Sequence, residues 1–171
     1  MTRTLIGASA AALLALAALA PVPAQSADTI AKFDGGIGSQ PLRAGGVPNA
    51  VFGTNPGGAP WVIADLKATV KADGAVSVNG KGLLLGGANG IGSTAAQSVR
   101  ARLICGGVFF ESELVKLAPD GDFRIGGFLN PLPPTPCNNG VDANGDTIPA
   151  VLLIINGAAT PAWFAAGIPK L

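Results

Sequence analysis

Residues 140–149, GVDANGDTIP, carry side chains at a spacing that could bind a calcium ion. Asp142, Asn144 and Asp146 stand at alternate positions, as do the first ligands of an EF-hand loop. Such a loop also needs a bidentate acid at its twelfth position, which is Leu153 here, and the pattern predicts no flanking helices. We interpret the segment as a solvent-facing turn and expect no metal site. A calcium-dependent module stays as an alternative.

A second stretch, LLLGGANGIGSTAA, resembles a nucleotide-binding turn. Its glycines Gly86, Gly90 and Gly92 have the spacing with which short-chain dehydrogenases admit a dinucleotide pyrophosphate. Those enzymes also use a catalytic tyrosine, and this sequence contains none. We therefore interpret the stretch as an irregular loop between strands and expect no cofactor.

The sequence contains no histidine, which is the commonest general base and a leading zinc ligand. Catalysis by Ser-His-Asp or Cys-His groups within this chain is thereby excluded. Four acids could in principle form a carboxylate pair, but turn chemistry or ion pairs on a strand explain them better: Glu111, Glu113, Asp120 and Asp122. We expect a non-enzymatic protein with no catalytic residues. The alternative is an exported hydrolase using carboxylates or a Ser–Lys pair.

Residues 1–27 predict a secretory signal peptide. One basic residue, Arg3, precedes an apolar run, and a stretch rich in proline and small residues follows. Cleavage after Ala24 or after Ala27 fits this pattern, and we favour Ala27. The uncharged stretch over 4–26 is nearly long enough for a retained membrane anchor, but its prolines and small residues favour cleavage. We expect a secreted or extracytoplasmic protein without a membrane span after cleavage.

The two cysteines, Cys105 and Cys137, are expected to form a disulfide, because an even pair in an exported protein is typical of one. Closing this loop should contribute roughly 3–4 kcal/mol of stability. Of eleven basic residues, Arg3 lies in the signal peptide, so ten remain against ten acids. This balance argues against a nucleic-acid binder, which would show a basic footprint.

The remaining chain has the pattern of an all-β domain. Residues 62–71 alternate apolar and polar side chains with period two, and a turn at residues 72–75 begins the return strand. Residues 151–155 form a continuous apolar run, suited to a strand buried on both sides. Seven or eight short strands predict a single β-sandwich, immunoglobulin-like or transthyretin-like, over residues 61–171. Residues 28–60 are predicted to be an irregular N-terminal segment with short strands near 30–33 and 50–52.

The most specific prediction concerns a hairpin over residues 99–114. A two-residue turn at Gly106-Gly107 places apolar side chains of one strand opposite apolar side chains of the other. It also places basic side chains opposite acidic ones. The predicted pairs are Ile104–Phe109, Leu103–Phe110, Arg102–Glu111, Arg100–Glu113 and Val99–Leu114. This register points Ile104 and Phe109 outward. Either another segment covers these two residues, or they form a candidate partner patch.

Three segments of the C-terminal half resemble a group of exported bacterial proteins of unassigned function. They are LAPDGDFRIGGFL, PAVLLIING and WFAAGIPKL, and a single cysteine in a proline-rich loop lies between the first two. The shared pattern is GDFRI … C … PxVLLI … WFAAGIPK, and the resemblance covers roughly residues 61–171. It implies a secreted domain without an assigned activity. We expect a binding or structural module whose partner is an unidentified protein or cell-envelope component.

Overall fold

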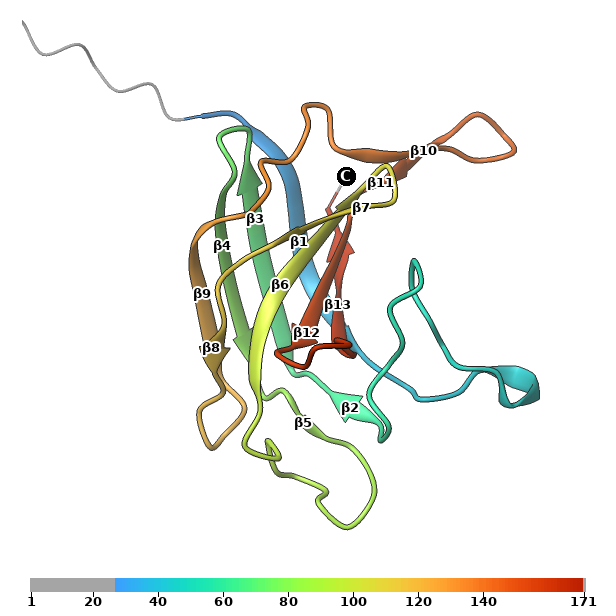
Figure 1. Ribbon diagram of the computed structural model, residues 1–171, viewed down its shortest axis with the longest axis vertical. Coiled ribbons are helices and arrows are strands. Elements are labelled where there is room, and N and C mark those ends of the chain that lie inside the picture. The colour runs from blue at the N-terminus through green and yellow to red at the C-terminus, as the bar shows by residue number, and fades with distance from the viewer. Residues whose placement is uncertain (1–26, 171) are drawn as a thin grey trace, which may run out of the picture.

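The computed structural model describes residues 27–170, so the predicted signal peptide lies outside the described residues except for Ala27. No helix within residues 27–170 is long and apolar enough to cross a bilayer. The predicted all-β class and the single sandwich-like domain are confirmed: nine strands form one antiparallel sheet that curls around its own core (Figure 1).

The main sheet has the order β7-β6-β12-β13-β1-β3-β4-β9, and β8 also pairs with β6. Its strands are β1 (Thr29–Gly38), β3 (Asp65–Lys71), β4 (Ala75–Lys81), β6 (Ser98–Cys105), β7 (Val108–Glu111), β8 (Val115–Lys116), β9 (Phe123–Phe128), β12 (Val151–Asn156) and β13 (Trp163–Pro169). The two ends of this order meet, because Glu111 at the end of β7 forms an antiparallel bridge with Asn130 after β9. The sheet therefore wraps round until its first and last strands touch.

Smaller elements lie at the two ends of the main sheet. They are the pair β2 (Trp61–Val62) and β5 (Leu84–Leu85), the hairpin of β10 (Asn138–Val141) and β11 (Thr147–Pro149), and a short 3-10 turn, η1 (Ala44–Gly46). The sequence predicts a loop where β10 and β11 lie, and the structure shows a two-stranded hairpin there instead. The glycine-rich stretch at residues 83–96 contains only the two-residue strand β5 and turns, as expected.

The core consists of the inward-facing side chains of the alternating strands. In β3 and β4, Leu66, Val70, Val76 and Val78 are buried while their neighbours in sequence face outward. The predicted turn between these strands is confirmed, with Gly74 at a φ of 83°. Period-two alternation thus places one face of each strand in the core, as the sequence predicts.

A second apolar cluster lies on the outer face of β6, β12 and β13. Its buried members are Ile104, Leu153, Ile155 and Trp163. The segment 49–57 covers this cluster: Trp163 Nε1 donates to the carbonyl of Asn49 at 3.0 Å, and the Trp163 amide donates to the carbonyl of Asn55 at 2.9 Å. Strand β12 is therefore buried on both sides, which explains its continuous apolar run.

The N-terminal segment differs from its predicted irregular form. Residues 29–38 form the ten-residue strand β1 between β13 and β3, so this part of residues 28–60 belongs to the sandwich. Its glycines make close approach possible: a Cβ on Gly36 would lie 2.8 Å from Leu66 Cβ, and one on Gly38 would overlap the Trp61 backbone. Residues 50–52 form no strand, only the isolated bridge between Val51 and Thr54.

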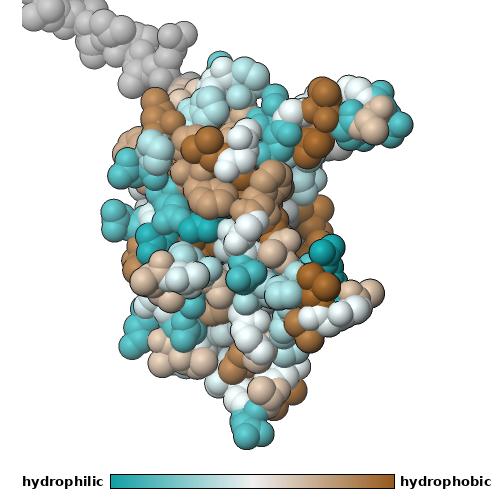
Figure 2. Space-filling view, turned by 45° about the vertical axis from the view of Figure 1, so that its right-hand side comes forward, coloured by the Kyte–Doolittle hydropathy of each residue, from teal (hydrophilic) through white to brown (hydrophobic). Residues whose placement is uncertain are grey.

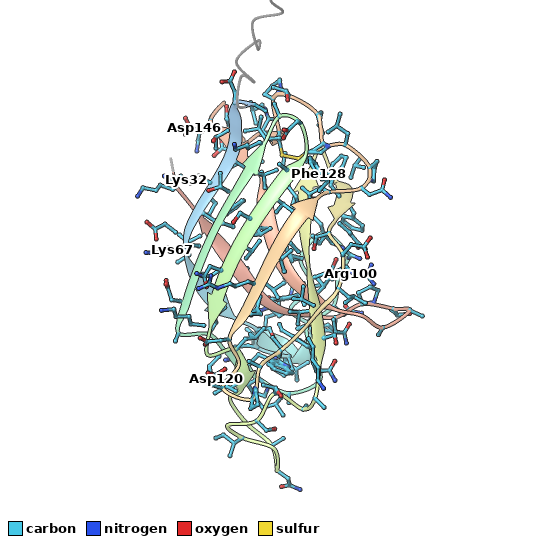
Figure 3. All side chains as sticks on the ribbon, turned by 90° about the vertical axis from the view of Figure 1, so that its left-hand side faces the viewer. Lys32, Lys67, Arg100, Asp120, Phe128 and Asp146 are labelled. Atoms are coloured by element: carbon cyan, nitrogen blue, oxygen red, sulfur yellow. A yellow bond between two sulfur atoms is a disulfide. The ribbon has the colours of Figure 1, made fainter. Side chains whose placement is uncertain are left out.

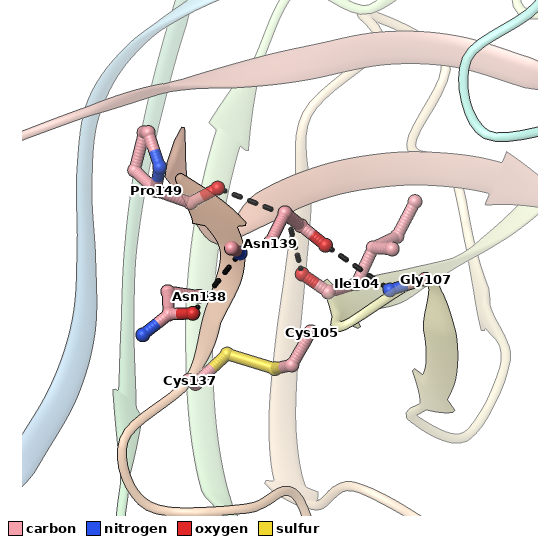
Figure 4. Close-up of a disulfide and its surroundings, with 8 residues drawn as sticks. Ile104, Cys105, Gly107, Cys137, Asn138, Asn139 and Pro149 are labelled. Atoms are coloured by element: carbon pink, nitrogen blue, oxygen red, sulfur yellow. Dashed lines mark hydrogen bonds between the residues drawn. A yellow bond between two sulfur atoms is a disulfide. The ribbon is translucent and has the colours of Figure 1, made fainter. Parts of the chain in front are cut away.

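The predicted disulfide between Cys105 and Cys137 is confirmed, with the two Cα atoms 5.1 Å apart. It joins the end of β6 to the start of β10 (Figure 4). Asn139 reinforces the junction, because its side-chain amide donates to the carbonyls of Ile104 and Pro149 at 3.1 and 2.9 Å. The β10–β11 hairpin is thus attached to the sheet by one covalent bond and by hydrogen bonds.

Candidate ligand-binding face

The predicted hairpin register is confirmed for its first three pairs. In β6 and β7, Ile104 lies opposite Phe109, Leu103 opposite Phe110 and Arg102 opposite Glu111. Both turn glycines, Gly106 and Gly107, have the positive φ that a tight hairpin turn needs.

The last two predicted pairs are wrong. Val99 lies opposite Val115, not Leu114, and Arg100 bonds to Glu111 rather than to Glu113. The register shifts by one residue after Glu111, at Ser112. The Ser112 hydroxyl accepts from the Ala101 amide at 3.0 Å, and the Ser112 amide donates to the Ala101 carbonyl at 3.0 Å. A side-chain oxygen thereby replaces a backbone carbonyl in the ladder and displaces the following residues.

The predicted partner patch of Ile104 and Phe109 is wrong for Ile104, because only Phe109 is exposed. Ile104 is 0% exposed, because the outer apolar cluster surrounds it, so it cannot contact a partner. Phe109 is 36% exposed, and the guanidinium of Arg102 lies 4.4 Å from its ring centre. On the side of the molecule that Figure 2 shows, hydrophobic residues are interspersed with hydrophilic ones. The patch is therefore reduced to one half-covered ring.

Four polar residues near Phe109 are linked by hydrogen bonds in the order Thr54, Arg102, Glu111 and Arg100. Arg102 Nε donates to Glu111 Oε1 at 2.8 Å, Arg102 Nη1 donates to the Thr54 hydroxyl at 2.8 Å, and Arg100 Nη1 donates to Glu111 Oε2 at 2.9 Å. Both oxygens of Glu111 thus accept from arginines, so this carboxylate is held by structural partners on both sides. The network joins the segment 49–57 to the sheet.

The segment that resembles a calcium loop is the tip of the β10–β11 hairpin. Asp142 Oδ1 accepts from the amides of Asn144 and Asp146 at 2.8 and 3.0 Å, and the Asp142 amide donates to the Asp146 carbonyl. Gly145 has a φ of 87°. These bonds are those of an Asx turn, so local backbone contacts account for the alternate Asp and Asn residues.

The outer face of β1, β3, β4 and β9 is open and polar. Figure 3 views this face, with Lys32 and Lys67 labelled near its edge. Because the inward positions alternate with outward ones, most of the exposed side chains of these strands are polar, and Phe128 of β9 is an exposed aromatic among them. The exposed polar ones are Lys32, Asp34, Lys67, Ser77, Asn79, Lys81 and Arg124.

Two shallow depressions cross this face and share Asn79. The first, of about 330 Å³, is lined by residues that include Lys32, Lys67 and Lys170. The second, of about 300 Å³, is lined by Lys81, Lys116, Asp122 and Arg124 among others. We call the six cations that line them the basic face: Lys32, Lys67, Lys81, Lys116, Arg124 and Lys170.

The basic face carries an excess of positive charge. Within residues 27–170, the ion pairs that the structure contains leave five of its six cations unpaired; Lys170 donates to Asp34 Oδ2 at 3.1 Å. The hydrogen bond from Lys170 and its charge lower the pKa of Asp34, and the charges of Lys67 and Lys32 lower it further. A lowered carboxyl pKa is what a positive local potential produces.

The basic face is not evident from the sequence alone. Its lysines and hydroxyl residues were visible only as the solvent side of alternating strands, and nothing local shows that β1, β3, β4 and β9 are neighbours. No protein-family model, curated protein or solved structure matches the chain. The face therefore has to be judged on its own geometry and charge.

Proposed function

We propose that the protein is a secreted, non-enzymatic β-sandwich module that binds an extracellular or cell-envelope partner through the basic face. The observation that carries the proposal is the contrast between two outer surfaces of one sheet. The segment 49–57 covers the surface over β12 and β13, whereas the surface over β1, β3, β4 and β9 is open and carries six of the ten basic residues in 27–170. Five of these cations have no ion-pair partner within residues 27–170, which favours a partner outside the molecule.

Export is supported by the disulfide, since such bonds persist in oxidising compartments. We also propose that the chain is related to the group of exported bacterial proteins that its C-terminal half resembles. The three segments of that resemblance include β9, β12 and β13, and the cysteine between the first two is bonded. We further propose that the sandwich is immunoglobulin-like or transthyretin-like in architecture. The curled antiparallel sheet supports this proposal.

The alternative of a carboxylate hydrolase has less support. Both oxygens of Glu111 accept from arginines, and Asp122 and Asp120 each accept from a backbone amide, those of Gly82 and Asp122. These carboxylates already have structural partners. A hydrolase of this class would need one that is free to exchange a proton with a substrate.

The test is co-sedimentation of the purified protein with insoluble cell-envelope material. We compare the wild type with the double variant Lys67→Glu/Arg124→Glu and with the control Arg43→Glu, an exposed cation next to η1 and outside the basic face. The proposal predicts that the wild type and the control sediment with the envelope and that the double variant stays in the supernatant. Absence of binding, or equal binding by the double variant, would contradict it. Hydrolysis of ester, peptide or glycoside substrates would instead support the enzyme.

A further inference from the structure

The basic face carries its charge in two clusters separated by uncharged polar side chains. Lys32, Lys67 and Lys170 line one depression, and Lys81, Lys116 and Arg124 line the other. The depression on the first side also contains Thr69 and Ser77, and Asn79 borders both. Asn79 therefore lies between Lys67 and Arg124, and the hydroxyls of Thr69 and Ser77 lie in the neighbouring row beside Lys32.

Strand pairing gives the distance between these clusters. Lys67 lies opposite Asn79, and Asn79 lies opposite Arg124, so the three residues form one row across β3, β4 and β9. Neighbouring strands are about 4.8 Å apart, which places the backbones of Lys67 and Arg124 roughly 10 Å apart. On the next strand, β1, Asp34 lies opposite Lys67 and Lys32 lies opposite Thr69. Cations spread over this distance suit a ligand with repeated negative charges better than a single small anion.

Acids beside the clusters leave a positive balance. Asp34 bonds to Lys170, Asp65 lies opposite Lys81, and Asp122 lines the second depression. Six cations against three acids give 6 − 3 = +3. The ligand should therefore be negatively charged.

On these grounds we infer that the basic face binds a linear anionic polysaccharide, with carboxylate or sulfate groups at the two cation clusters and sugar hydroxyls at Thr69, Ser77 and Asn79. This inference rests on the proposed binding function and adds the chemical class of the partner. Hydroxyl and amide side chains both donate and accept hydrogen bonds, which suits the hydroxyls of a sugar ring.

A nucleic acid is the competing polyanion, and the face suits it less well. Single strands are held by aromatic side chains on which bases stack. Among the residues that line the two depressions, the aromatic ones are Phe33 and Phe123, and both are buried, at 2% and 4% exposure. Phe128 of β9 is 66% exposed, but it lies opposite Ala75 and outside both depressions. The two depressions therefore offer charge and hydrogen bonds to a ligand but no exposed ring for stacking.

The experiment measures binding of the purified protein to four immobilised probes: polygalacturonate, dextran sulfate, neutral dextran and single-stranded DNA. We expect the first two to bind and neutral dextran not to bind, with a loss of affinity when the ionic strength rises from about 0.05 to about 0.5 M. The two acidic probes distinguish carboxylate from sulfate recognition. Lys67→Glu and Arg124→Glu should each weaken binding about tenfold, since each replaces an attraction by a repulsion.

Arg43→Glu makes the same change of net charge away from the face and should leave binding unchanged. Circular dichroism and thermal unfolding of each variant separate a lost contact from a lost fold. The inference is overturned if neither acidic probe binds, if Arg43→Glu is as harmful as Lys67→Glu, or if DNA binds as tightly as the polysaccharides. Envelope binding that depends on the basic face but that none of these probes reproduces would leave the proposed function standing and remove only the polysaccharide.

Discussion

Arg102 is only 7% exposed, so its positive charge needs a compensating negative charge nearby. Glu111 supplies the compensating charge and also bonds to Arg100. Removing one partner of a buried pair is costly because the remaining charge is left without compensation. We expect Glu111→Gln to lower the free energy of unfolding by about 2–4 kcal/mol, somewhat less than for a fully buried pair because Glu111 is partly exposed. Chemical denaturation measures this change.

Glu113→Gln is the matched control for this prediction. Glu113 is exposed and stands two residues from Glu111, and the sequence alone pairs it with Arg100. In the structure Arg100 bonds to Glu111 instead, so the control should change stability by no more than about 0.5 kcal/mol. Equal losses in the two variants would contradict the observed pairing.

Asp34 reports the potential of the basic face. Lys170 bonds to it and lowers its pKa below the ordinary value of 3.8, with further contributions from Lys67 and Lys32. A lowered folded-state pKa means that the ionised carboxyl stabilises the fold above the unfolded pKa, and that this stabilisation is lost as the pH falls through the folded pKa. We expect NMR titration to show the lowered pKa, and Lys170→Met to raise it towards 3.8. A titration unchanged by Lys170→Met would rule out this cause.

At the scale of elements, local pattern predicted the β3–β4 and β6–β7 hairpins because turn and strand residues there agree with one register. The sequence pattern failed to predict the register where a side-chain oxygen takes the place of a backbone carbonyl in the ladder. Ser112 looks like any polar residue in the sequence, yet its hydroxyl bonds to Ala101 and shifts the strand by one residue. The glycines of β1 similarly favour an irregular segment when the sequence is considered alone, whereas in the fold they allow the neighbouring chain to approach. Both effects depend on tertiary contacts.

The disulfide is predicted to hold the β10–β11 hairpin on the sheet. Cys105 and Cys137 are 32 residues apart, and removing such a link should lower the free energy of unfolding by roughly 3 kcal/mol. We expect Cys105→Ala/Cys137→Ala to unfold at lower denaturant and to exchange its β10 amides faster. Asn139→Ala, which keeps the disulfide but removes two side-chain bonds, should have a smaller effect. A double variant as stable as the wild type would contradict this role.

At the scale of the whole molecule, the basic face results from strand order. Lys170 and Asp34 are 136 residues apart, and β9 reaches β4 only after the chain has passed through β6, β7 and β8. Alternation predicts that Lys67 and Arg124 face solvent, but it does not predict that they share one surface. The covering of the outer cluster by the segment 49–57 is equally non-local. Both features could therefore be found only from the three-dimensional arrangement.

The last prediction concerns the junction that closes the sheet. The Glu111 amide donates to the Asn130 carbonyl at 3.0 Å, and the Asn130 amide donates to the Glu111 carbonyl at 2.8 Å. Asn130 is exposed, so without these bonds its amide would exchange rapidly with solvent. We expect hydrogen exchange to show both amides protected to a degree comparable with those of β9. The exposed amide of Ala143, in the β10–β11 turn, is the fast reference.

Asn130→Pro tests the same junction by removing one of its two donors. We expect faster exchange at Glu111 and a lower midpoint of unfolding, because the junction then loses one of its two hydrogen bonds. If the two wild-type amides exchange as fast as Ala143, the sheet is open in solution. Strands β7 and β9 would then be free edges able to pair with a second molecule, and sedimentation at increasing protein concentration would show association. A closed sheet instead stays monomeric over the same range, because the bridge between Glu111 and Asn130 holds the ends of β7 and β9 against each other.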